Sequence, residues 1–316
     1  MPASADDAPK PAFRWGYAIF VVILLAIFGF IAVGIISLFT GTDVASLNGN
    51  VALIPIEGEI VGTSDDGLFS SGTVASPDVI DLIEKAEKNP GIKAIIFEID
   101  SPGGSAVASE EIADAVKKTN KTTVAWIREV GASGAYWIAS STDHIVANRA
   151  SITGSIGVIA SYLEFPGFLE RYNITYRRLV AGKYKDIGSP FKEMTPEEQA
   201  VFQDSLNEMR DYFVSEVAKN RHMSKKDVDK VANGLFYLGG QAKDYGLIDE
   251  LGGKQEAINY IEKKENITVE IAEYKKPSGL LGIFSGAISQ ASFYAGKGIG
   301  SAFLEKGASS SISIKT

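Results

Sequence analysis

Three short segments of small residues are the part of this sequence best suited to catalysis. They occupy residues 100–104 (DSPGG), 131–135 (GASGA) and 153–158 (TGSIGV), and each follows a predicted strand. Because the carboxyl ends of parallel strands meet at one edge of a sheet, we expect the three segments to converge there. Glycine lets a substrate approach the backbone, whose N–H groups can stabilise the negative oxygen formed when a carbonyl is attacked. The pattern therefore favours nucleophilic chemistry on a carbonyl group.

Ser133 is the candidate nucleophile. It stands at the predicted start of a helix between small residues, so its hydroxyl can project while the first N–H groups of the helix are unpaired. The same position also suits a serine that only caps the helix. Gly103 and Gly104 are equally either donors to a substrate carbonyl or part of a turn. The residue types alone leave both interpretations open.

A serine nucleophile needs a base, and the choice of base is narrow. The chain has no cysteine and only two histidines, His144 in a predicted strand and His222 in a helix–helix turn, both positions where a structural role is more common. A lysine can serve if burial lowers its pKa from the usual value of about 10.4. Lys183 and Lys185 are the candidates, although two lysines in a loop are commonly solvated. We expect no metal and no cofactor, since cysteine ligands are missing and a histidine-rich site is impossible.

The elements that must position these residues alternate between strands and helices. This spacing predicts an α/β fold with a mainly parallel sheet covered by helices, and no linker or repeat divides residues 51–270. A capping box at 195–198 predicts a long helix to about residue 220. The predicted strands are 51–61, 93–99, 122–127, 144–147 and 174–180, and the other predicted helices are 76–88, 105–118 and one that begins at 133.

Five motifs follow one another along the chain. They are SPGG (101–104), GASG (131–134), TGSIGV (153–158), GKYKD with SPFKEMT (182–195), and GGQA with GLIDELG (239–252). In this order they resemble the S49 family of membrane-bound serine peptidases, which includes signal peptide peptidase A (SppA). The similarity runs from about residue 51 to 258 and is to the single-domain form of the family. Gly240 stands where the family pattern has arginine, which puts a structural or subunit contact in doubt rather than the chemistry.

The resemblance implies a ClpP/crotonase-like fold of repeated β-β-α units and a Ser–Lys dyad. By motif, Ser133 matches the nucleophile and Lys185 the general base, in preference to the other lysine of that loop. Gly104, with Gly103, matches the oxyanion-hole segment, and Ser155 matches a serine that orients the lysine. The resemblance also implies a ring-shaped homo-oligomer in which the lysine can come from the neighbouring subunit.

Residues 16–39 carry no charged side chain and are long enough to cross the roughly 30 Å hydrocarbon layer of a membrane. We predict a transmembrane helix here, with a cleaved signal peptide as the alternative. Lys10 and Arg14 precede it and no basic residue follows until Lys85, so the N-terminus (1–15) is expected in the cytoplasm. The protein is then a single-pass protein of the cell membrane, with its catalytic domain on the extracytoplasmic side.

The rest of the chain divides into a linker (40–50), a Ser–Lys peptidase domain (51–270) and a C-terminal tail (271–316). The tail mixes apolar residues with glycine, alanine and serine, so it is expected to be flexible, to lie on membrane lipid as an amphipathic segment, or to occupy the enzyme's own groove.

The expected substrates are hydrophobic peptides at the membrane, including remnant signal peptides, as the resemblance implies. Nucleic acid is excluded as a partner because the net charge is −8 and no basic cluster is present. Two alternatives remain. One is a membrane Ser–Lys protease of the NfeD/stomatin type. The other is a non-catalytic crotonase-like scaffold or acyl-CoA-binding protein, which the acidic charge disfavours.

Overall fold

The computed structural model describes residues 21–29, 49–63 and 72–275. The chain divides into two units, Met1–Ser46 and Leu47–Thr316. In the first unit, residues 21–29 form a helix with exposed side chains. Among the described residues, no helix is both long enough and apolar enough to cross a membrane. Most of the predicted transmembrane helix (16–39), the N-terminus (1–15) and the tail beyond residue 275 lie outside the described residues.

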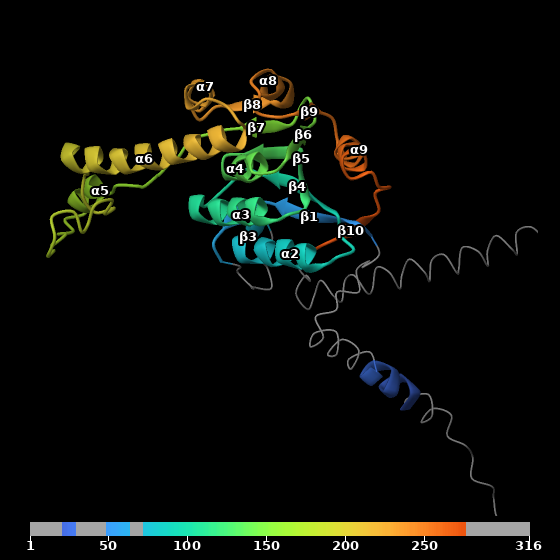
Figure 1. Ribbon diagram of the computed structural model, residues 1–316. Helices are drawn as coiled ribbons and strands as arrows, with labels where there is room; N and C mark the ends of the chain where they lie inside the picture. Colours follow the sequence, from blue (N-terminus) through green and yellow to red (C-terminus); the bar gives the residue numbers. More distant parts are fainter. Residues whose placement is uncertain (1–20, 30–48, 64–71, 276–316) are drawn as a thin grey trace, which may run out of the picture. The chain divides into compact units, whose positions relative to one another are not determined.

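The second unit is built on one mixed, mainly parallel sheet (Figure 1). The strands along its main path are all parallel to their neighbours, and only the pairing of β7 with β8 is antiparallel. A parallel sheet with helical connections is what the alternating sequence pattern predicted. The main path is β10 (Ile271–Glu273), β1 (Val51–Glu57), β4 (Ala94–Ser101), β5 (Thr122–Ala132), β6 (His144–Ala147) and β9 (Glu250–Leu251), and β7 (Ile152–Gly154) pairs with the end of β5 and with β8 (Phe236–Leu238).

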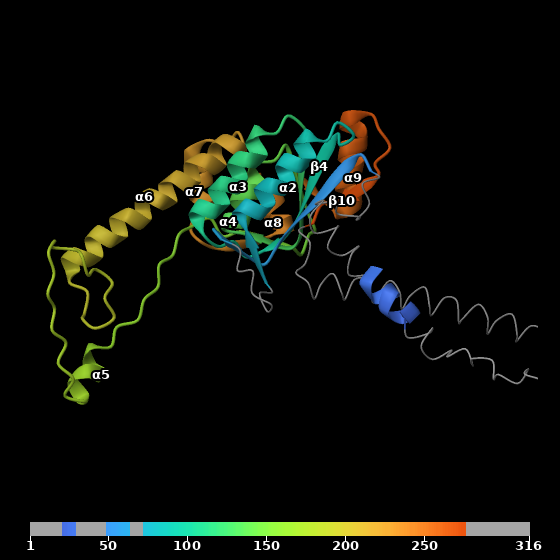
Figure 2. The same cartoon turned by 90° about the horizontal axis from the view of Figure 1, so that it is seen from below.

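Helices cover both faces of this sheet (Figures 1 and 2). On one face, α2 (Ser76–Lys88), α3 (Ala106–Lys118) and α4 (Gly134–Ser140) pack on side chains such as Phe97, and on the other α9 (Lys254–Glu265) packs on Ile96. Successive residues of a strand point to opposite faces, so a strand buried on both faces must be apolar along most of its length. This explains the run AIIF at the start of β4.

The predicted strand 51–61 is wrong as a single element. Gly58 has a φ of +82°, and a Cβ there would lie 2.2 Å from the carbonyl oxygen of Gly72. This bend takes the chain out of the main sheet after β1. The following residues form β2 (Glu59–Val61), which pairs with β3 (Thr73–Ala75) in a separate two-stranded parallel sheet.

A long arm projects from the body (Figure 2). It contains α5 (Pro166–Arg171) and α6 (Pro196–Asn220), whose Thr195–Glu198 capping box confirms the predicted helix start. The C-terminal part of α6 is buried in the body through residues such as Phe213 and Val217, whereas α5 has no buried residue. The predicted strand 174–180 is also wrong, because these residues form an irregular part of the arm without a strand partner. After α6 come two short helices, α7 (Lys225–Val231) and α8 (Gly239–Asp244).

Candidate active site

Ser133 lies in the turn between β5 and α4 in a backbone conformation that side chains rarely adopt. Its φ is +54° and its ψ is −124°, and its N–H donates a 2.8 Å hydrogen bond to the carbonyl oxygen of Gly154. It is the first flanking residue of α4, yet its hydroxyl makes no capping hydrogen bond. The purely structural role considered for this serine is therefore not the one it fills. Strained backbone of this kind persists where the surroundings enforce it, and it is concentrated at functional sites.

Gly103 packs directly against this turn. A Cβ on Gly103 would lie 2.7 Å from the nitrogen of Gly134 and 2.9 Å from the Cβ of Ser133, and its φ of +99° also requires glycine. Its own N–H donates to the hydroxyl oxygen of Ser101 at 3.1 Å, in a buried position. Gly103 is therefore a close neighbour of Ser133, but its N–H is already engaged.

The backbone N–H groups of Gly104 and Gly134 are the free donors beside Ser133. A Cβ on Gly134 would lie 3.5 Å from the nitrogen of Gly104, which places the two glycines side by side. Within the described part of the chain, neither N–H donates a hydrogen bond. β2 locks Gly104 in place, because Ile60 donates to the carbonyl oxygen of Gly103 and accepts from the N–H of Ser105. Gly134 was not among the predicted site residues, although its position directly after the nucleophile candidate and at a helix start was a usable signal.

Ser155 lies next to the same turn. It follows Gly154, the partner of the Ser133 N–H, and has a φ of +50°. Its hydroxyl donates to the carbonyl oxygen of Gly234 at 3.3 Å. The three small-residue segments therefore converge at the carboxyl ends of β4, β5 and β7, as predicted from their strand positions.

Lys185 lies between α5 and α6, away from the three small-residue segments. It is exposed on the arm, and within the described residues its ammonium group makes no hydrogen bond or ion pair. The two preceding side chains, those of Lys183 and Tyr184, both bind Glu197 in the first turn of α6. The loop that carries Lys185 is therefore attached to the outer end of that helix.

The length of α6 separates Lys185 from Ser133 within one chain. Phe213 of α6 stacks on Trp137 of α4, with ring centroids 4.7 Å apart, and the backbone N–H of Trp137 donates to the carbonyl oxygen of Ser133. Glu197 lies 16 residues before Phe213, so at 1.5 Å per residue the two are about 24 Å apart along the helix. One subunit does not bring Lys185 to its own Ser133.

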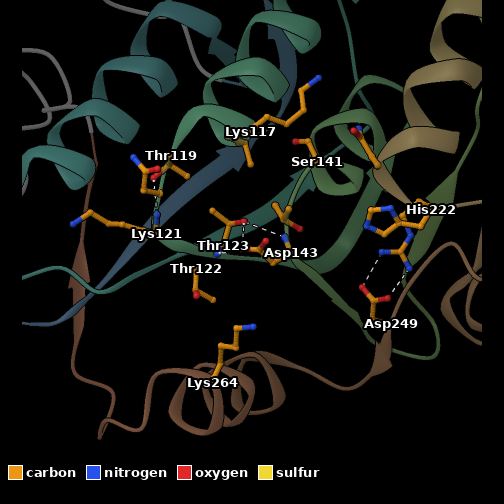
Figure 3. A pocket seen from close by; sticks show the side chains of 15 residues that line it. Lys117, Thr119, Lys121, Thr122, Thr123, Ser141, Asp143, His222, Asp249 and Lys264 are labelled. Carbon is orange, nitrogen blue, oxygen red and sulfur yellow. Dashed lines mark hydrogen bonds and ion pairs between the residues drawn. The ribbon is translucent and has the colours of Figure 1, made fainter.

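The two histidines are not at this site. His144 begins β6, stacks on Tyr260 at 3.9 Å between ring centroids and lies 3.2 Å from Glu250. His222 follows α6 and lines a pocket of about 560 Å³ at the amino ends of β5 and β6 (Figure 3). That pocket contains none of the predicted site residues.

The pocket in Figure 3 is polar, and its best-buried cation is already paired. Arg221 makes a two-pronged contact with Asp249, at 2.7 and 2.8 Å. Burial opposes ionisation of Asp249, but the Arg221 guanidinium outweighs it and holds the pKa of this carboxyl below its usual range. The contact joins the end of α6 to the GLIDELG segment. In the described ranges, no group of three or more histidine or acidic side chains is placed to hold a metal.

Comparison with known proteins identifies the family. The model of peptidase family S49 matches residues 115–268. A provisionally named protease of Methanocaldococcus jannaschii is 37% identical over 240 residues, which cover 74% of this chain and 75% of that protein. A provisionally named signal peptide peptidase SppA of Enterococcus faecium is 32% identical, over 72% of this chain and 67% of that protein. Protease 4 of Haemophilus influenzae is 33% identical over 68% of this chain and 35% of its own length.

A solved structure of a mutant membrane-bound stomatin-specific protease is also similar, with a TM-score of 0.47 and 16% identity, covering 72% of this chain and 98% of that one. The family relationship rests on the Methanocaldococcus jannaschii and Enterococcus faecium relatives, which share at least 30% identity with this chain over two thirds or more of their own length. The chain belongs to peptidase family S49 and is a serine peptidase.

Proposed function

We propose that this serine peptidase is a membrane-anchored endopeptidase in which Ser133 is the nucleophile and Lys185 of a neighbouring subunit is the general base. One observation carries the proposal. Lys185 is exposed and has no partner among the described residues, and its loop is attached at Glu197, about 24 Å along α6 from the Phe213 contact with α4. A second subunit supplies the base that the first cannot.

The reaction follows from these groups. The neutral amine of Lys185 takes the proton of the Ser133 hydroxyl as its oxygen bonds to the carbonyl carbon of the peptide. The N–H groups of Gly104 and Gly134 hold the resulting oxyanion, and Lys185 then gives its proton to the leaving amine. Water next attacks the acyl-enzyme, passing a proton to Lys185, and the serine leaves with that proton. This revises the expected oxyanion pair, since Gly134 replaces Gly103 as the second donor.

An oligomer is required by this chemistry and suits the surface of the arm. Ile159, Leu163 and Leu179 are 85%, 71% and 97% exposed, which is unusual for large apolar residues clustered on one projection. In a ring, each subunit gives one surface to a neighbour and receives another. The arm of one subunit would then lie over the site of the next and bring Lys185 to that subunit's Ser133. Ser155 would accept a hydrogen bond from the arriving amine and orient it.

The proposed substrates are hydrophobic peptides, with remnant signal peptides among them. β8 has one edge without a strand partner among the described residues, and its neighbourhood exposes Leu235, Phe236 and Leu238. An extended peptide can add to such an edge through its backbone while its side chains contact apolar residues. We infer that residues 16–39 anchor the chain in the cell membrane, that the peptidase domain of residues 51–270 lies outside the cytoplasm, and that it has the ClpP/crotonase-like form of the α/β fold.

The test is peptidase activity of the full-length protein in detergent on a fluorogenic hydrophobic peptide. Ser133→Ala and Lys185→Ala are expected to be inactive while remaining assembled, and Lys183→Ala is the matched control, expected to keep activity because Tyr184 still holds the loop to Glu197. An active Lys185→Ala with an inactive Lys183→Ala would reassign the base. Equal activity in all variants would remove the dyad altogether.

A further inference from the structure

The loop that carries Lys185 is held by its neighbours on both sides. Lys183 and Tyr184 both contact the same oxygen of Glu197, and Asp186 is bound by Arg178. Lys185, between them, is exposed and without a partner in the described part of the chain. Of the four consecutive side chains 183–186, three bind other residues of the arm or of the start of α6, and only that of Lys185 has no such partner among the described residues.

Arg178 makes the most elaborate of these contacts. Its Nε and Nη2 donate to the two carboxylate oxygens of Asp186, the latter at 2.6 Å, and Nη2 also donates to the carbonyl oxygen of Lys183 at 3.4 Å. A planar guanidinium suits this two-pronged geometry, which the point charge of a lysine cannot reproduce. The Asp186 side chain is only 12% exposed, although the arm around it is open. Arg178 therefore fixes both the backbone and the carboxylate of the loop.

Three carboxylates of the arm and of the start of α6 are each paired with a cation other than Lys185. Hydrogen bonds from Arg178 hold the pKa of Asp186 below its usual range, so Asp186 is anionic at neutral pH. Tyr176 and Tyr184 are the other titratable groups that act on these pairs. The pairs are Arg178–Asp186, Lys183–Glu197 and Lys192–Glu198.

Asp186 is the carboxylate adjacent to Lys185 in the chain. Without Arg178, the Asp186 carboxylate would lose its hydrogen-bonded cation and would be free to turn towards Lys185, one residue away, with Lys192 as a further positive charge acting on it. An opposite charge nearby stabilises the protonated lysine and draws it into an ion pair, which opposes its use as a base.

We propose that Arg178 is a positioning residue that sequesters Asp186, so that Lys185 reaches the partner's Ser133 as an unpaired amine. This inference rests on the proposed Ser133–Lys185 dyad and adds a role for the arm's ion pairs. In this role Arg178 acts through Asp186 and Lys185 rather than on the reacting atoms.

The test compares Arg178→Gln, Asp186→Asn and the double variant in the full-length protein, with kcat/KM of the fluorogenic peptide measured against pH. The acid limb of this profile reports the ionisation of the base in the free enzyme. Arg178→Gln is expected to move the limb to higher pH by about 0.5–1 unit, lowering activity below it about three- to tenfold. Adding Asp186→Asn is expected to return the acid limb to its wild-type pH, because the carboxylate that would pair with Lys185 is gone.

Arg177→Gln is the matched control, since it removes an adjacent exposed arginine for which the structure gives no ion pair. Light scattering checks that each variant keeps its assembly. If Arg178→Gln does not assemble, Arg178→Lys is the second variant, because it keeps the positive charge but not the two-pronged guanidinium contact with Asp186. For Arg178→Lys we expect a smaller shift in the same direction.

An unmoved limb in the assembled Arg178 variant, or a shift that Asp186→Asn does not reverse, overturns the role of Arg178. The dyad is judged separately by Lys185→Ala. If Lys185→Ala is inactive and the limb is unmoved, only the positioning role fails. If Lys185→Ala is active, the proposed function fails.

Discussion

Mixing two inactive variants distinguishes a dyad completed between subunits from one completed within a subunit. Ser133→Ala keeps the arm and its lysine, while Lys185→Ala keeps the serine. Because about 24 Å of α6 separates the outer arm from the α4 contact in one chain, a site can be restored only where the two variants are neighbours. In a randomly mixed ring, half of the sites have the serine and half of those receive the lysine. About a quarter of the wild-type activity should therefore return.

The assay needs mixed oligomers of known composition. The two variants are co-expressed with different affinity tags, purified through both tags, and assayed per subunit on the fluorogenic peptide. The control mixes wild type with the Ser133→Ala/Lys185→Ala double variant. A dyad between subunits gives about a quarter of wild-type activity in both mixtures, whereas a dyad within a subunit gives none in the first and about half in the control. The second result would refute the separation argued from α6.

Two further predictions concern the turn beside Ser133 and the Arg221–Asp249 ion pair in the pocket at the amino ends of β5 and β6. Gly103→Ala places a Cβ 2.7 Å from the nitrogen of Gly134, so we expect kcat to fall about 10²-fold or more through a displaced oxyanion donor, measured by steady-state kinetics. Asp249→Asn removes the partner of a largely buried Arg221, and we expect urea unfolding at pH 7 to show a loss of about 3 kcal/mol. Because the folded pKa of Asp249 is lowered, this stabilisation is present above about pH 4 and is lost as pH falls through the folded value.

Each prediction has a clear contrary result. Wild-type kcat in a folded Gly103→Ala protein would show that the approach of Gly103 to Gly134 does not matter for the reaction. A difference between Asp249→Asn and wild type that stays constant from pH 7 to pH 2 would show that ionisation of Asp249 does not contribute. Circular dichroism of both variants establishes that the comparison is made on folded protein.

Much of the fold could be predicted because local patterns carry it. β4 and β5 are apolar runs of strand length, and the helix start at Thr195 has a capping box that the structure reproduces. The strand break at Gly58 could not be predicted, since it depends on close contact with Gly72, which directly precedes β3. The segment 174–180 was mistaken for a strand because its apolar residues resemble a buried element, yet Leu179 is 97% exposed.

The candidate site divides in the same way. The small-residue segments around Gly103, Ser133 and Ser155 were expected to meet because each follows a strand, and neighbouring parallel strands end at one edge. The N–H of Gly103 donates to the hydroxyl of Ser101, a contact that no spacing rule reveals, and Gly134 is therefore proposed as the second oxyanion donor in its place. That the N–H of Gly103 is engaged could be recognised only from the hydrogen bonds of the folded chain.

The sequence by itself determined the available chemistry. The chain has no cysteine and only two histidines, which excludes a thiolate nucleophile and leaves few candidate bases, and the resemblance of the motifs implies Ser133 and Lys185 as the dyad. The tertiary structure alone decided where those residues lie. Separation along the chain does not set distance in space, and the packing of α6 on α4 holds Lys185 far from its own Ser133 because a helix is a rigid spacer of fixed rise. That packing makes a second subunit part of the proposed active site.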